Sequence, residues 1–568
     1  MQARRSFLLE DAQSCRARDS AAARALHYGA PAGIPCMLAA VVQVRCVLAL
    51  LPSGRAWESV RRFVHSWTAP WQETTASMAT AIPTNECEFT LGLIAEVCGG
   101  SLHGAEPTQV VRGVSTDTRT ITKGSLFVAL RGERVDGHAF VAAALERGAS
   151  AALVARDSAV QGPCVRVEDT ITALGLLART ALRRERTSRV LPVLAIGGAA
   201  GKTTTKELAA LSVAALFGDT LSTRGNLNNL VGAPMTLLTV APAHRALVIE
   251  VGTNAPGEIA KLAAIVEPDV ALVLNVDNEH TEGLKSLEAV AEEEGALFAG
   301  TRDLGTSTVV GNLEEPYSYS QIERGPKRAR RLSFGEGEGA DVRLLSRVAT
   351  ADGRSALRLR VSGALTSSGR AVECSVTLGL LGPGPAIDAA AALAATLALR
   401  ARPVDADEIE RAAKAFAQAA PVAGRLVPVT LSSGAMVIDD TYNANPRSVK
   451  ASIDAAAELA ALRGGSLHVL IGDMLELGEL APSLHGEVRD YLSARMPKSV
   501  AAVGPLFSGA FAKIASDDVR CVRAPEDAAE WAHPRIDARD VVLVKGSRGI
   551  RMERAVAALC ANTTTMMC

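Results

Sequence analysis

The sequence has little net charge and few aromatic side chains. Its 568 residues include 60 lysines and arginines against 61 aspartates and glutamates, so the formal net charge is −1. Nucleic acids and anionic membranes attract proteins through an excess of basic residues, so neither is expected as the main partner. Aromatic residues make up only 4% of the chain, although 48% of it is hydrophobic. The apolar content is therefore mainly aliphatic, which favours layered α/β domains.

Clustered cysteines are also missing. The 10 cysteines are scattered, with no CxxC pair and no group of cysteine and histidine. Neither a disulfide framework nor a zinc site is therefore expected, and reduced thiols in a cytoplasmic protein explain the cysteines. At ~150 residues per domain, the length predicts three or four domains.

The first ~80 residues lack the hydrophobic periodicity of the remainder. They are rich in arginine and contain one apolar run, IPCMLAAVVQVRCVLALLP, which Gln43 and Arg45 interrupt. A signal peptide normally has its apolar segment nearer the start, and a membrane span tolerates a central arginine poorly. We therefore expect residues 1–84 to be an extension that is either disordered or translated from a start upstream of Met78. A targeting or anchoring segment is the alternative.

Three blocks follow the extension, at residues 85–185, 186–420 and 421–568. The first mixes strands and helices, and the third contains AMVIDD, LHVLIG, SVAAVG and DVVLVKG as strands. In the middle block, VLPVLAIG, RALVIEV and VALVLNV each run into a loop and a helix. This alternation predicts an α/β protein with a central, doubly wound, mostly parallel sheet between two smaller α/β domains.

The most informative loop is GGAAGKTTTK, which lies between a predicted strand and a predicted helix. Its glycines are expected to let the backbone turn its N–H groups toward phosphate oxygens, and the helix N-terminus adds its positive dipole end. Lys202 would reach the phosphates and the Thr203 hydroxyl would hold Mg²⁺. The pattern fits the short form G-x-x-G-K-T. A glycine-rich turn with an exposed lysine is the alternative.

Polar residues follow the next two strands of the middle block. IEVGTN places Glu250 at one strand end, and NVDNEH places Asn275 and His280 after the other. Open α/β sheets bind ligands at the carboxyl ends of their strands. Each residue alone could be an ordinary loop residue, but together, after a phosphate loop, they indicate a nucleotide and cation site.

One acid lies on an apolar helix face. SLEAVAEEEGALFAG, residues 286–300, has helical periodicity, and Glu294 falls on its apolar stripe. Glu292 and Glu293 are expected to point to water. Because an ionised carboxylate leaves water only with a partner, we expect Glu294 to join Glu250 and His280 in a second cation site. A buried pair with an arginine is the alternative.

From Phe89 to near its end the chain resembles the Mur ligase family, on the stretches GVSTDTRTITKGSLFVALRGERVDGHAF, GGAAGKTTTKE, TRGNLNNLVGAPMTLL, EVGTNAPGEI, NVDNEHTEG, DDTYNANPRSV, IGDMLELGE and VKGSRGIRME. The resemblance implies the three-domain Mur architecture, with a UDP-substrate domain, a central ATP-binding domain and a Rossmann-like C-terminal domain that closes over ATP.

The resemblance also implies an activity. ATP would phosphorylate the terminal carboxylate of UDP-N-acetylmuramoyl tripeptide, and the amine of D-alanyl-D-alanine would attack the acyl phosphate. Mg²⁺, in two ions, would assist, and the enzyme would be a cytoplasmic monomer with no nucleic-acid or membrane role. A folylpolyglutamate or cyanophycin type ligase of the same fold is an alternative, as is a nucleotide-binding homologue without catalysis.

The residue roles that the resemblance implies fall into four groups. Catalysis is assigned to Lys202, His280 and Arg425. ATP contacts are assigned to Gly198, Ala199, Ala200, Gly201, Lys202, Thr203, Thr204, Asn275, Asp440, Asn443 and Asn445. Substrate contacts are assigned to Ser115, Thr116, Asp117, Thr118, Arg119, Asn226, Asn228, Asn229, Lys545, Ser547 and Arg548. Metal contacts are assigned to Thr203, Glu250, His280 and Glu294.

The sequence departs from the family at two informative places. The family's G-x-H-N-x-x-N run appears as GPGPAID, residues 382–388, so a nucleotide contact expected there cannot be carried over. Where the family usually carries a carbamylated lysine that supports Mg²⁺, this chain has Glu294. We therefore expect Glu294 to replace that modified lysine.

Overall fold

The computed structural model describes residues 80–132, 135–277, 286–512, 514 and 516–562. Our expectations for the extension before residue 80 and for His280 lie outside these residues. Within them, no helix has both the length and the apolar character needed to cross a membrane. Residues 80–568 form one compact unit.

The N-terminal part contains a small mixed sheet. Its strand order is β2-β7-β6-β5-β4; β4 to β7 run parallel, and β2 pairs antiparallel with β7. A separate antiparallel pair joins β1 and β3. The elements are β1 (Glu88–Thr90), α4 (Leu91–Val97), β2 (Ser101–His103), β3 (Val110–Arg112), β4 (Val114–Ser115), η1 (Thr118–Thr120), β5 (Leu126–Val128), η2 (Gly137–Phe140), α5 (Val141–Glu146), β6 (Ala151–Ala155), β7 (Cys164–Val167) and α6 (Thr170–Ser188).

The central part contains a nine-stranded sheet among the described residues, in the order β16-β15-β14-β13-β12-β11-β8-β10-β9. Strands β8 to β14 pair in parallel, and β15 and β16 add an antiparallel edge. The strands are β8 (Val193–Gly197), β9 (Thr220–Ser222), β10 (Ala246–Glu250), β11 (Val270–Val273), β12 (Thr308–Asn312), β13 (Arg330–Gly335), β14 (Val342–Ala349), β15 (Ser355–Val361) and β16 (Val372–Leu378). The helices are α7 (Lys202–Phe217), α8 (Gly232–Leu237), α9 (Glu258–Val266), α11 (Leu287–Ala299), α12 (Pro316–Ser320), η3 (Gln321–Arg324), η4 (Gly363–Leu365), α13 (Pro383–Ala398), α14 (Ala406–Lys414) and η5 (Ala415–Gln418).

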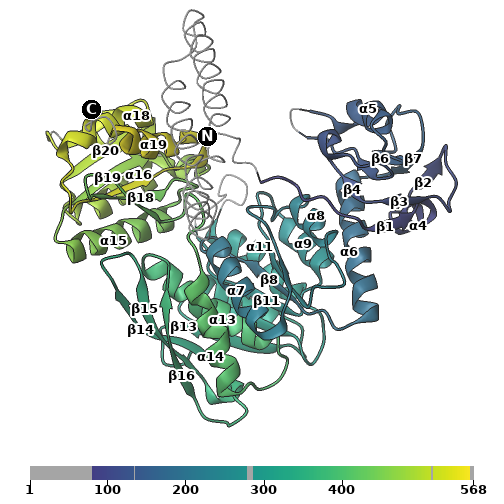
Figure 1. Ribbon diagram of the computed structural model, residues 1–568, viewed down its shortest axis with the longest axis horizontal. Helices are drawn as coiled ribbons and strands as arrows, with labels where there is room; N and C mark the ends of the chain where they lie inside the picture. The colour runs from purple at the N-terminus through teal and green to yellow at the C-terminus, as the bar shows by residue number, and fades with distance from the viewer. Residues whose placement is uncertain (1–79, 133–134, 278–285, 513, 515, 563–568) are drawn as a thin grey trace, which may run out of the picture. The chain divides into compact units, whose positions relative to one another are not determined.

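Helices cover both faces of the central sheet, and Figure 1 shows α7 and α13 side by side on one of them. Leu194 and Ile196 of β8 share one apolar core with residues of α7 and α13. Val193 and Ala195 point the other way and share a second core with residues of α6, α9 and α11. A strand that is buried on both sides reads as a continuous apolar run, because each face must meet a helix layer. The predicted doubly wound sheet is confirmed.

The C-terminal part is a second doubly wound sheet, ordered β17-β18-β22-β19-β20-β21, in which only β17 pairs antiparallel. Helices α15, α16 and α17 cover one face, and α18 and α19 the other. The elements are β17 (Val427–Thr430), β18 (Met436–Asp440), α15 (Pro446–Arg463), β19 (Leu467–Gly472), η6 (Gly478–Leu480), α16 (Ala481–Ser493), β20 (Ser499–Val503), α17 (Pro505–Phe511), β21 (Val519–Val522), α18 (Pro525–Ala532), η7 (His533–Arg535), β22 (Val541–Lys545), η8 (Arg548–Ile550) and α19 (Glu553–Asn562). The Rossmann-like prediction is confirmed, and the exact domain limits stay predictions.

Candidate active site

The phosphate loop connects β8 to α7. The strand ends at Gly197 and the helix begins at Lys202. Gly198 has a φ of +118° and Gly201 a φ of +87°, backbone angles that residues with a side chain rarely adopt. At Gly198 an added Cβ would also lie 2.9 Å from the Leu274 nitrogen. The loop therefore needs glycine at both positions.

The first half of this loop does not offer its N–H groups to a ligand, which corrects our expectation. Gly198 N donates to Glu294 Oε2 at 2.7 Å, and Ala199 N donates to the Asn275 carbonyl at 2.9 Å. Ala200 N donates to Asn275 Oδ1 at 2.8 Å. The N–H groups in the first turn of a helix have no intrahelical acceptor, so the beginning of α7 is where this loop can receive phosphate.

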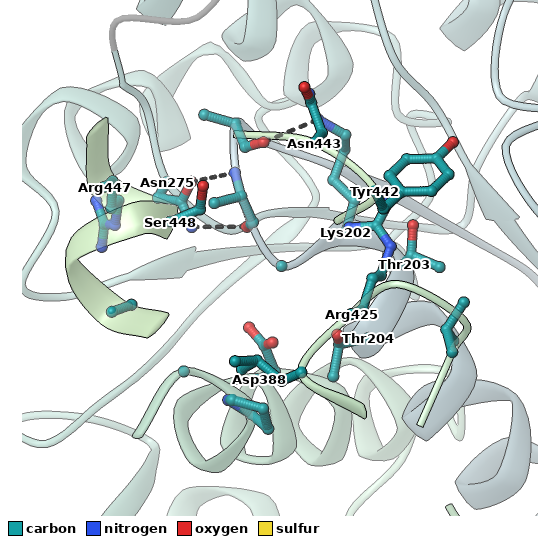
Figure 2. A pocket seen from close by; sticks show the side chains of 18 of the residues that line it. Lys202, Thr203, Thr204, Asn275, Asp388, Arg425, Tyr442, Asn443, Arg447 and Ser448 are labelled. Carbon is teal, nitrogen blue, oxygen red and sulfur yellow. Dashed lines mark hydrogen bonds between the residues drawn. The ribbon is translucent and has the colours of Figure 1, made fainter. Parts of the chain in front are cut away.

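Lys202 and Thr203 lie at that helix start. The Lys202 amine donates to the Gly198 carbonyl and, at 3.1 Å, to the Ala199 carbonyl, so it lies over the loop (Figure 2). The Thr203 hydroxyl donates to Glu250 Oε1 at 3.3 Å. Both groups are therefore close to the place where phosphate would enter.

Glu250 is a buried acid beside this helix start, with only 2% of its surface exposed. Asn228 Nδ2 donates to its Oε1 at 2.8 Å, whereas Oε2 is buried without a hydrogen-bond partner in the part of the chain described. A buried carboxylate oxygen without a donor is costly unless a cation or another donor serves it. The Thr203 hydroxyl and the Glu250 carboxylate therefore fit Mg²⁺, which prefers oxygen ligands.

The two central acids of α11 are both buried, and one of them corrects the sequence analysis. Glu292 is exposed as expected. Glu293 is only 8% exposed, and its carboxylate accepts from Gly257 N at 2.7 Å and from Ile259 N at 2.8 Å, at the start of α9. Glu294 is 3% exposed and lies against the phosphate loop. Both acids are held by backbone N–H groups, so α11 has a wider buried face than one apolar stripe predicts.

A cavity of about 690 Å³ opens above the phosphate loop. It brings together most of the residues assigned to ATP, together with four assigned to substrate. The lining residues that were assigned a role from the sequence are Ala199, Ala200, Gly201, Lys202, Thr203, Thr204, Asn226, Asn228, Asn229, Glu250, Asn275, Arg425, Asp440, Asn443, Asn445 and Lys545. Gly198, Glu294, Ser547, Arg548 and residues 115–119 are not among its lining residues.

Asp388 of α13 belongs to this cavity, although the sequence analysis assigned it no role. It is 7% exposed, and a Cβ added at Gly201 would lie 2.5 Å from its Oδ1. Burial raises the pKa of Asp388 well above its usual range, while the Thr205 hydroxyl and the charges of Arg447 and Arg425 act in the opposite direction. The raised pKa favours the protonated form of this carboxyl, which has a donor as well as an acceptor. Its only sequence signal was its place as the last residue of the unusual GPGPAID run.

Two substrate-assigned side chains of the C-terminal domain are used inside the protein. Lys545, 2% exposed, donates to Asp440 Oδ2 at 2.6 Å and to the Asn443 carbonyl at 2.9 Å. Ser547 is 3% exposed and donates to the Ala444 carbonyl at 3.2 Å. These bonds hold the DDTYNANP loop against the end of β22. Substrate contact by either side chain stays a prediction.

Tyr442 of the same loop lies between two arginines. The Arg425 guanidinium carbon is 4.3 Å from the ring centre, and that of Arg548 is 5.2 Å away. Arg425 Nε is buried and has no hydrogen-bond partner within the described residues. Tyr442 was missed because an aromatic residue in a loop has no pattern that reveals its stacking partners. Figure 2 shows Arg425 and Tyr442 on the same side of the cavity as Lys202.

The loop at 115–119 is ordered by its own side chains. Asp117 accepts from Arg119 N at 2.8 Å and from the Arg119 guanidinium at 3.0 Å. The hydrogen bond from Arg119 holds the pKa of Asp117 below its usual range. A contact of this loop with UDP stays a prediction.

The site combines a doubly wound α/β sheet, a glycine-rich phosphate loop, a lysine and oxygen ligands that fit a cation. This combination is typical of enzymes that bind nucleotides. Three family models match the chain: Mur ligase family, catalytic domain, at residues 110–185; Mur ligase middle domain at 196–396; and Mur ligase, glutamate ligase domain, at 424–548. The chain belongs to the Mur ligase family.

Individual relatives agree with the family models. The UDP-N-acetylmuramoyl-tripeptide--D-alanyl-D-alanine ligase of Escherichia coli is 33% identical over 481 residues, which cover 84% of this chain and 99% of the relative. The ligase of the same name from Bacillus subtilis is 31% identical over 483 residues, 82% of this chain and 97% of the relative. The crystal structure of MurF from Acinetobacter baumannii has a TM-score of 0.74 at 28% identity and covers 84% of this chain and 100% of that one. MurF ligase from Thermotoga maritima in complex with ADP has a TM-score of 0.68 at 27% identity, and the match covers 80% of this chain and 98% of that one.

Proposed function

We propose that this chain is an ADP-forming, ATP-dependent ligase that joins D-alanyl-D-alanine to UDP-N-acetylmuramoyl tripeptide. The main support is one cavity in which the phosphate loop, Glu250 and Arg425 meet. Relatives that carry this activity in their names match nearly their full length. The sequence stretches DDTYNANP and GDMLELGE support the same member of the family.

The reaction must overcome repulsion between two anions. A carboxylate is a poor nucleophile toward ATP while both carry negative charge, so Lys202 and Arg425 would neutralise charge as the phosphoryl group moves. The amine of the dipeptide then attacks the acyl phosphate carbonyl, a tetrahedral intermediate forms, and phosphate leaves. No protein nucleophile is needed. Exclusion of water protects the acyl phosphate, which is the reason for a C-terminal domain that closes over ATP.

Mg²⁺ is part of this proposal. Thr203 and Glu250 would hold one ion, and the buried Oε2 of Glu250 supports that assignment. The ion would neutralise phosphate charge. His280 and Glu294 are proposed to support a second ion.

The decisive assay measures phosphate release from purified protein. Release is expected only when ATP, UDP-N-acetylmuramoyl tripeptide and D-alanyl-D-alanine are all present, and the product should contain both the tripeptide and the dipeptide. A Lys202→Met variant should be inactive. Release with glutamate and a folate, or with no second substrate, would contradict the proposal.

The place of action and the oligomeric state follow from the same proposal. ATP and a UDP-linked precursor are held inside the cell, so we expect the enzyme in the cytoplasm. We expect a monomer, as the family resemblance implies. Cell fractionation and light scattering test these two points.

A further inference from the structure

Three consecutive N–H groups of the phosphate loop are held by acceptors on two other elements. Asn275, just after β11, accepts hydrogen bonds from the N–H groups of Ala199 and Ala200. Glu294 of α11 accepts one from the N–H group of Gly198, at 2.7 Å. Hydrogen bonds to a carboxylate are stronger than those to neutral groups. The Glu294 bond is therefore a strong restraint on the front of the loop.

The contact between Glu294 and the loop is close and buried. Glu294 is 3% exposed, and a Cβ added at Gly197 would lie 2.8 Å from its Oε2. On the other side, Gly198 closely approaches the backbone of Leu274 and Asn275. The front of the loop is thus held between the Glu294 carboxylate and the end of β11, which leaves it little room to move.

The neighbouring acid does the same for a different segment. Glu293 accepts from Gly257 N and Ile259 N at the start of α9 and has no described contact with the phosphate loop. The two glutamates share a helix, a charge and near-complete burial. Glu293 is therefore a matched control for Glu294.

We propose that Glu294 is a positioning residue for the phosphate loop, whose carboxylate holds Gly198 so that the start of α7 faces the phosphates. The inference rests on the nucleotide site of the proposed function but not on the identity of the other two substrates. It also requires no metal ion. A buried donor that loses its acceptor is costly, so loss of Glu294 should favour other loop conformations and weaken nucleotide binding.

Metal-free ADP binding separates positioning from metal support. Calorimetry with the full chain in excess EDTA would compare the wild type with Glu294→Ala, Glu294→Gln and Glu293→Ala. Glu294→Ala should bind ADP roughly 10-fold more weakly, because Gly198 N–H then lacks its acceptor. Glu294→Gln keeps an acceptor oxygen and should stay within about 3-fold of the wild type. Glu293→Ala should lower the melting temperature without weakening ADP binding.

Amide hydrogen exchange tests the loop without any ligand, and so decides the matter even if metal-free ADP binds too weakly to measure. Glu294→Ala should speed exchange in peptides covering residues 196–204, and Glu293→Ala should speed it only in those covering 254–262. Unchanged exchange at 196–204 in Glu294→Ala would overturn the proposal, as would Glu294→Gln behaving like Glu294→Ala in both measurements. Failure of the phosphate-release assay would contradict the proposed function and leave these results unaffected.

Discussion

Lys545 and Asp440 form a buried ion pair whose removal should measurably destabilise the C-terminal domain. The two side chains are 3% and 10% exposed, and Lys545 Nζ lies 2.6 Å from Asp440 Oδ2. Removing one partner of a buried pair typically costs ~3–5 kcal/mol, because the other charge stays buried. Asp440 would retain the Ser452 hydroxyl at 2.5 Å and Leu426 N at 3.2 Å. We therefore expect Lys545→Met to cost about 3 kcal/mol, at the lower end of that range.

Tryptophan fluorescence can report on this domain alone. The chain has 4 tryptophans, and only Trp531 lies in the C-terminal domain, against the core formed by α18 and α19. Changing Trp57, Trp67 and Trp71 to phenylalanine leaves Trp531 as the single reporter during urea unfolding. The free energy of unfolding is then obtained from the midpoint and slope of its transition. A double variant with Asp440→Asn should recover part of the loss from Lys545→Met, because no charge is left unpaired.

The ion pair of Arg554 and Glu526, which lies within the C-terminal domain, supplies the control. Its two side chains are 53% and 33% exposed. Exposed pairs contribute ~0–1 kcal/mol, so Arg554→Ala should have little effect on the unfolding that Trp531 reports. If Lys545→Met cost no more than ~1 kcal/mol, the pair would not be a buried restraint. The Lys545 amine would then be available for the amine substrate, as the family resemblance implies.

Four further outcomes are expected. A chain that starts at Met78 should keep the melting temperature and turnover of the full chain; loss of soluble protein would contradict this. Because Arg425 and Asn443 are assigned to a domain that closes over ATP, the radius of gyration in small-angle scattering should fall when an ATP analogue and tripeptide substrate bind. Glu294→Lys should lose activity and regain some with bicarbonate, which carbamylates lysine, whereas the wild type should not respond. Burial raises the pKa of Asp540, but hydrogen bonds from the N–H groups of Asp537 and Ser466 and from His468 outweigh it and lower the pKa to about 2. The lowered pKa stabilises the fold by about 2 kcal/mol, which is fully present above the unfolded pKa near 4 and is lost as the pH falls through 2. Asp540→Asn should therefore unfold more easily at pH 7, and its stability should depend less on acid.

Local sequence determined the phosphate loop and the sheets around it. Strand, loop and helix around Gly198 and Gly201 are neighbours in the chain, so the glycine spacing and the apolar runs contain the required information. Continuous apolar runs likewise predicted strands buried on both faces, and hence the doubly wound sheets. These predictions depend on residues within one or two turns of each other, where backbone conformation is decided by the residues themselves.

Only the tertiary structure decided which groups meet across long separations. Glu294 and Gly198 are 96 residues apart in the chain, and Asp388 reaches Gly201 only because α13 packs against α7. The periodicity of α11 predicted one buried face, yet α11 packs against both α9 and the phosphate loop, so Glu293 is buried as well. Hydrophobic periodicity indicates which face of a helix is buried, but not which backbone N–H group will donate a hydrogen bond to a side chain on that face. A buried carboxylate therefore receives its role from its partner, and the fold alone supplies that partner.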